Sequence, residues 1–270
     1  MRAGDRQGKM TGFRQALSWD LAPPQSASTD TAGHSSDGRV PWGTRDALLV
    51  ASGFAAWVTL VRYVLATDVG RRLAGDGTAV LGPLELAFLV PVMWLVLHKY
   101  GVGLWSLGFK RFPGRAIEHG LALLVAVFAL NCCYTSALVE IRHVSPTGGT
   151  NAAGAMGNLW LAVLGGAVLA PFAEEVLFRS FVYPGLSARI GNLGAALASS
   201  GLFALVHLRW TAVPTLFALG FGLCMLYDHY RSVWPPVVVH ALSNAFVLGV
   251  GLLARLPSTG PVLPPGSTWT

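Results

Sequence analysis

Apolar residues are gathered into long runs along this 270-residue chain, and short polar stretches separate the runs. The runs cover about residues 46–66, 79–98, 119–140, 158–186, 193–209, 212–229 and 235–254. Most of them come near the ~20 residues that a helix needs to cross the hydrocarbon of a bilayer. The pattern therefore predicts an all-α fold, a polytopic membrane protein with about seven transmembrane helices.

The composition agrees with a membrane protein and excludes several other classes. Hydrophobic residues make up 53% of the chain and charged residues 12%, about half of the roughly 25% that soluble domains carry. Three cysteines, two of them adjacent in an apolar run, give no disulfide framework. A soluble globule, a disulfide-stapled scaffold and a disordered chain therefore all fit poorly.

Four regions follow from the same pattern. Residues 1–45 and 255–270 are rich in Ser, Gly and Pro, which predicts disordered polar tails. Residues 46–154 carry the first helices and an interfacial loop, since residues 104–120 mix aromatic with basic side chains. Residues 155–254 hold most of the ionisable groups inside apolar runs and are expected to form the catalytic helical core.

The basic residues indicate orientation and not a nucleic-acid partner. They give a net charge of +6 but lie between the apolar runs and form no single cluster. If the N-terminus is cytoplasmic, 12 Lys and Arg fall on the inner side and 5 on the outer side, as the positive-inside rule requires. We expect an integral protein of the plasma (inner) membrane with a cytoplasmic N-terminus.

Glu85, Glu174 and Glu175 lie inside the apolar runs, and each is informative because an ionisable group there costs about 2.5–3.5 kcal/mol. Glu85 stands alone near a run end, so we interpret it as a snorkelling or satisfied carboxylate. Glu175 and Arg179 are four residues apart and form a favourable helical ion pair, a structural clamp. Glu174 lies about 100° round the helix from that pair and is predicted to be functional.

Two histidines on later helices can meet Glu174. Glu174 and His207 are equally far from the turn expected near residues 189–192, so they lie at similar depth. His240 and Asn244 share one face of the last helix. For Asn244 an interhelical hydrogen bond is an equally good interpretation. His240 reaches this depth only if the sixth helix is tilted, shortened or partly re-entrant.

Three motifs in order resemble the CPBP family, which includes CAAX proteases and bacteriocin-processing (Abi) proteins. They are E-E-x-x-x-R at Glu174, F-x-x-x-H at Phe203 and H-x-x-x-N at His240, spread over about residues 155–252. The resemblance implies an intramembrane endopeptidase acting on a membrane-associated protein or peptide. It implies that Glu174 and His207 activate water and that His240 and Asn244 hold the oxyanion. Glu175, Arg179 and Phe203 are then supporting residues.

Other interpretations of the same residues stay open. Glu174, His207 and His240 also form a zinc ligand set, although no H-E-x-x-H is present and a cofactor-free mechanism is favoured. A proton-coupled transporter also uses buried Glu and His. A non-enzymatic immunity or scaffold protein of the bilayer could keep the fold and need only some of these groups.

Overall fold

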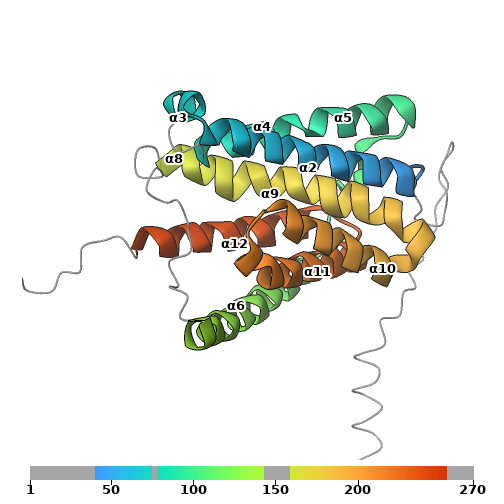
Figure 1. The fold of residues 1–270 in the computed structure, drawn as a ribbon. Helices are drawn as coiled ribbons and strands as arrows, with labels where there is room; N and C mark the ends of the chain where they lie inside the picture. Colours follow the sequence, from blue (N-terminus) through green and yellow to red (C-terminus); the bar gives the residue numbers. More distant parts are fainter. Residues whose placement is uncertain (1–39, 75–77, 143–158, 254–270) are drawn as a thin grey trace, which may run out of the picture. The chain divides into compact units, whose positions relative to one another are not determined.

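The computed structural model describes residues 40–74, 78–142 and 159–253, and every regular element in these ranges is a helix (Figure 1). The all-α fold is thereby confirmed. The elements are α2 (Thr44–Ala66), α3 (Asp68–Ala74), α4 (Thr78–Ala87), α5 (Leu89–Trp94), η1 (Leu95–Lys99), η2 (Leu104–Leu107), α6 (Arg115–Arg142), α8 (Leu159–Ala162), η3 (Val163–Leu169), α9 (Ala170–Glu175), η4 (Val176–Val182), α10 (Tyr183–Val206), η5 (Trp210–Ala212), α11 (Val213–Tyr230) and α12 (Trp234–Leu253).

Five helical stretches of the described residues are long and apolar enough to cross a membrane, so the chain is an integral membrane protein. They are Thr44–Ala66, Arg115–Glu140, Val163–Val206, Trp210–Tyr230 and Trp234–Leu253. The count of seven is not confirmed. The third stretch has 44 residues, about 66 Å of helix, which is roughly twice the thickness of bilayer hydrocarbon.

Gly191 divides that long stretch into two legs. It has φ 70° and ψ 167°, a backbone conformation that is essentially open to glycine alone. The turn falls inside the predicted interval of residues 189–192. Because the legs run back along each other, Ser199 on the second leg donates a hydrogen bond to the Phe178 carbonyl on the first, at 3.2 Å.

The predicted span 79–98 is not one continuous helix. It is divided among α4, α5 and the π-helical turn η1. Pro91 has no N–H for the carbonyl of Ala87, where α4 ends, so the α-helical ladder is interrupted there. The sequence pattern missed this break because proline does not reduce the apolarity of the run.

The site lies among helices that come from both halves of the chain. α2 packs against η4 and α10, α4 packs against η3 and α9, and α6 packs against α11 and α12 (Figure 1). The centre of the core contains the aromatic residues Phe54, Phe178, Phe181 and Phe203, each at most 1% exposed.

The last residues of the predicted N-terminal tail belong to this core. Trp42 is 1% exposed, donates a hydrogen bond from Nε1 to the Phe181 carbonyl at 2.8 Å and stacks on the Phe181 ring. Disorder is therefore wrong for this part of residues 1–45, because an indole in the core fixes the chain just before α2 begins at Thr44. Residues 1–39 and the predicted tail 255–270 lie outside the described residues.

Candidate active site

The two adjacent glutamates sit on a helix with irregular hydrogen bonding on both sides. α9 contains Glu174 and Glu175 at its end, and the π-helical segments η3 and η4 flank it. Pro171, near the start of α9, has no N–H for the carbonyls of the preceding turn. The π-helical segment η3 before Pro171 accommodates this missing donor. Such π-helical segments are frequent at functional sites.

Glu175 joins two helices through one carboxylate oxygen. Its Oε1 lies 2.8 Å from the guanidinium of Arg179 and 2.7 Å from Nδ1 of His240 on α12. Glu175 and Arg179 are 0% exposed. Arg179 also donates to the Gly220 carbonyl of α11, at 3.4 Å. The predicted ion pair is present, and it extends to His240 and α11.

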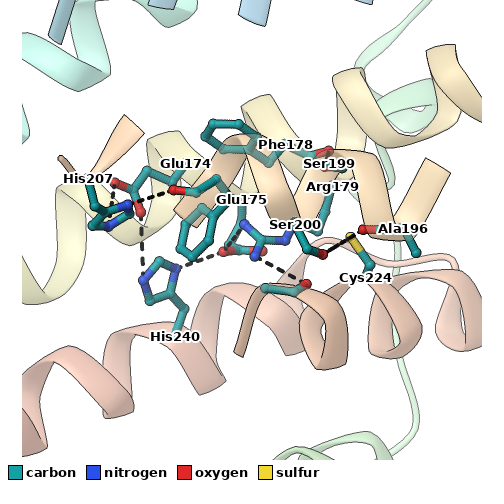
Figure 2. A network of polar contacts seen from close by, with 12 residues as sticks. Glu174, Glu175, Phe178, Arg179, Ala196, Ser199, Ser200, His207, Cys224 and His240 are labelled. Carbon is teal, nitrogen blue, oxygen red and sulfur yellow. Dashed lines mark hydrogen bonds and ion pairs between the residues drawn. The ribbon is translucent and has the colours of Figure 1, made fainter. Parts of the chain in front are cut away.

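Glu174 lies between the two histidines (Figure 2). Its Oε1 is 3.9 Å from Nε2 of His207, and its Oε2 is 3.6 Å from Nε2 of His240. The Nδ1 of His207 lies 2.7 Å from the Phe203 carbonyl. Since a carbonyl only accepts, that Nδ1 carries the proton, and a neutral His207 turns a lone pair on Nε2 toward Glu174.

Phe203 contacts Arg179 and both histidine rings. The guanidinium carbon of Arg179 lies 4.3 Å from the centre of its ring, a cation–π contact. The rings of His207 and His240 meet the Phe203 ring edge-on, with centroids 4.8 Å and 5.6 Å away. A bulky ring at this position holds both imidazoles in place without competing for their polar atoms.

Asn244 is not among the groups that contact Glu174. Its Nδ2 donates to the Gly166 carbonyl of η3, at 2.9 Å. In the π-helical register Gly166 is the acceptor for the N–H five residues later, and that residue is Pro171, which has none. Asn244 therefore satisfies a carbonyl that proline leaves free, as membrane helices require. One hydrogen of its amide is still available.

A small cavity beside Glu174 is lined by two charged residues that were not predicted to belong to the site. Glu85 of α4 and Arg62 of α2 line it together with Glu174 and His207. Glu85 is 7% exposed, so the interpretation of a snorkelling carboxylate is wrong, because α4 places it against α9. Arg62, a cation inside the first apolar run, was the feature of the sequence that could have indicated a buried partner for Glu85.

The sequence predicted that His240 reaches the depth of Glu174 only if the sixth helix, α11, is tilted, shortened or partly re-entrant. α11 has no non-helical residue between Val213 and Tyr230. Gly220 allows close packing, since a Cβ there would lie 3.0 Å from the Phe203 ring. His240 nonetheless reaches Glu174, so neither a shortened nor an interrupted helix explains the contact.

Glu174, His207 and His240 carry the donor atoms that zinc prefers. Among the described residues, however, no group of three or more His, Cys, Asp or Glu side chains has the arrangement of a metal site. The Nε2 atoms face different carboxylate oxygens of Glu174, at 3.9 Å and 3.6 Å. Both distances are longer than a direct hydrogen bond.

The chain shows similarity to proteins whose names describe membrane peptidases, and a family match covers the region of the site. The family described as "Type II CAAX prenyl endopeptidase Rce1-like" matches residues 156–246. YdiL of Bacillus subtilis (strain 168), whose name provisionally describes a membrane peptidase, is 28% identical over 88 residues, which are 33% of this chain and 36% of YdiL. The "membrane-embedded CAAX protease MroQ" of Staphylococcus aureus (strain USA300) is 30% identical over 93 residues, which are 32% of this chain and 38% of MroQ.

These matches span little more than a third of each relative's length. No solved structure matches the chain. The family match includes Glu174, Phe203, His207 and His240 and ends two residues beyond Asn244. Residues 156–246 are therefore similar to the Rce1-like family of type II CAAX prenyl endopeptidases, which agrees with the resemblance of the three motifs.

Proposed function

We propose that this chain is an intramembrane endopeptidase that hydrolyses a peptide bond of a membrane-associated protein or peptide. The observation that carries the proposal is the position of Glu174, a buried carboxylate with an imidazole Nε2 on each side of it. The two relatives, whose names describe membrane peptidases, support the same reaction class. Positioned acids and bases of this kind contribute about 10²–10⁴-fold to hydrolysis.

Glu174 acts as the general base in this mechanism. A water molecule between Glu174 and Nε2 of His207 gives one proton to the carboxylate, and its oxygen attacks the carbonyl carbon of the substrate. The tetrahedral intermediate then collapses, the carbon–nitrogen bond breaks, and the same proton passes, directly or through His207, to the leaving amine. The products are a carboxylic acid and an amine, so the protein returns to its starting state.

His240 and Asn244 stabilise the developing oxyanion. Nδ1 of His240 faces the carboxylate of Glu175. In this mechanism both ring nitrogens carry a proton, so that Glu175 accepts from Nδ1 and the N–H on Nε2 donates to the oxyanion. The second amide hydrogen of Asn244 is the other donor. Loss of one donor of this type costs about 10²–10³ in kcat.

The test is the substitution Glu174→Gln, which keeps the volume of the side chain and removes its basicity. We expect membrane proteins that are cut in wild-type cells to accumulate uncut in Glu174→Gln cells, at equal abundance of the enzyme. Quantitative proteomics of new protein termini measures this accumulation. Identical termini in both cells would exclude proteolysis and leave the immunity, scaffold or transporter interpretations.

A cofactor-free mechanism is proposed, with zinc bound by Glu174, His207 and His240 as its alternative. If zinc were the cofactor, its chemistry would be to lower the pKa of a bound water. We expect cleavage of the proteins found in the preceding experiment to continue after exhaustive chelation of purified enzyme. Loss of cleavage on chelation, restored by added zinc, would establish the metal mechanism.

We further propose an inner-membrane location with a cytoplasmic N-terminus. In this orientation a surface pocket of about 510 Å³ faces the cytoplasm, lined by Phe109, Lys110, Arg111, Phe112 and Trp234. Its aromatic and basic side chains suit the interface of the inner leaflet. A single cysteine in place of Ser187 should react with an impermeant thiol reagent from the cytoplasm, and one in place of Ser145 from outside. Reaction of both from one side would refute the orientation.

A further inference from the structure

The cavity beside Glu174 has walls from both halves of the chain. Its lining residues are Phe54, Val58, Arg62, Glu85, Glu174, Val206 and His207. The space is wide enough for about one water molecule. Glu174 and His207 both line this cavity, so the hydrolytic water of the proposed mechanism would lie in it.

Two polar atoms on the opposite wall lack partners within the described part of the chain. They are Oε2 of Glu85 and Nε of Arg62, and both are buried. An unsatisfied buried polar atom costs about 1–3 kcal/mol, and in the hydrocarbon region this cost is not relieved by bulk water. Apolar residues at these positions would avoid the cost. Groups kept at such a cost, next to a reactive carboxylate, are candidates for function.

From this geometry we propose that Glu85 is a positioning residue for the hydrolytic water, with Arg62 supplying the balancing positive charge. The inference rests on the proposed protease function and extends it to α2 and α4. One O–H of the water donates to Glu174, the carboxylate that takes its proton. The other O–H donates to Oε2 of Glu85, and the lone pair on Nε2 of His207 is left to receive the proton that Glu174 passes on toward the leaving amine. With both hydrogens held, the oxygen lone pair points away from the two carboxylates and toward the substrate carbonyl.

Two substitutions separate this role from a structural one. Glu85→Gln keeps an oxygen that accepts a hydrogen bond, so it should keep most of the cleavage. Glu85→Leu removes the acceptor, so the water loses its orientation and cleavage should become about 10- to 100-fold slower. Both substitutions remove the negative charge that balances Arg62, so the thermal midpoints of the two purified variants should be similar.

The experiment measures the ratio of cut to uncut protein for those membrane proteins that accumulate in Glu174→Gln cells. The matched control is Glu118, an exposed carboxylate near the start of α6 that does not line the cavity. Glu118→Leu and Glu118→Gln should both leave the ratio unchanged. A low ratio in Glu85→Leu alone, with a thermal midpoint no lower than that of Glu85→Gln, supports the proposal.

Three outcomes overturn it, and they differ from failure of the protease function. Wild-type ratios in Glu85→Leu would show that the second acceptor is not needed. Equal losses of cleavage in Glu85→Leu and Glu85→Gln would show that the acceptor oxygen kept by Gln does not restore cleavage. Loss of Glu85→Leu protein from the membrane would assign Glu85 to folding. The protease function itself fails if wild-type and Glu174→Gln cells do not differ.

Discussion

In the α6 stretch Arg115–Glu140 and the site-bearing stretch Val163–Val206, hydropathy and burial are related in the opposite way to that in a soluble protein. The most apolar windows of the two have mean hydropathies of 2.0 and 1.3, and 11% and 39% of their residues are buried. The more apolar stretch is therefore the less buried one. Lipid tails are as apolar as leucine, so apolar surface gains little by entering the protein, whereas polar groups must find partners there.

The side chains of the two stretches show the same difference. α6 exposes large apolar residues along its length, namely Leu121, Val125, Leu130 and Val139. The other stretch buries ionisable and hydroxyl groups, namely Glu174, Glu175, Arg179, Ser180, Ser199 and Ser200. The helix that carries buried polar groups thus lies inside the protein, and the helix without them lies at the lipid boundary. Substitutions in the two stretches should therefore change stability by very different amounts.

The largest effect on stability is expected at the buried ion pair. Glu175→Gln leaves Arg179 without its counter-charge, which should lower the free energy of unfolding by about 3–5 kcal/mol. Thermal and denaturant unfolding of the purified protein in detergent measure this change. Glu174→Gln is the matched control and should leave stability nearly unchanged. An inactive Glu175→Gln with unchanged stability would show that the roles of the two glutamates are reversed.

Asn244→Ala should have an intermediate effect on stability. The substitution leaves the Gly166 carbonyl without its donor, which should cost about 1–2 kcal/mol. If the second amide hydrogen also holds the oxyanion, cleavage should fall by about 10²–10³-fold. Stability and cleavage are measured on the same preparation. A stability loss with wild-type cleavage would leave Asn244 a purely structural residue.

The smallest effects are expected from one substitution made in both environments. Cys132 and Cys133 are exposed on α6, and Cys224 is buried in α11 against Ser200. Cys132→Ala and Cys133→Ala should change the free energy of unfolding by less than about 0.5 kcal/mol, and Cys224→Ala should lower it by about 1 kcal/mol. Equal effects in unfolding experiments would contradict the assignment of α6 to the lipid boundary.

Counting along the sequence predicted the parts of the site that depend on helical periodicity. Glu174 and His207 face each other because they are almost equally far along the chain from the turn at Gly191. Glu175 and Arg179 pair because they are four residues apart. Both relations depend only on the rise and the pitch of a helix, so no knowledge of the packing was needed.

Other features depend on packing between distant helices, and the sequence did not reveal them. The position of Glu85 in the same cavity as Glu174 requires α4 to pack against α9. The bond of Asn244 to Gly166 requires an acceptor 78 residues away. No local periodicity relates such positions, and the apolarity of the run 79–98 does not show the break that Pro91 makes in its helix.

Pro171 has a consequence for the order in which the site assembles during synthesis. The carbonyl that it leaves free is claimed by Asn244, and one helical turn earlier His240 is bound by Glu175. α12 is thus fastened at two points on one face, and a shift of one turn along its axis would release both. These contacts, and with them the second imidazole beside Glu174, exist only after the last described helix has been inserted. If the chain is the proposed protease, its nascent form is therefore inactive until translation has passed α12.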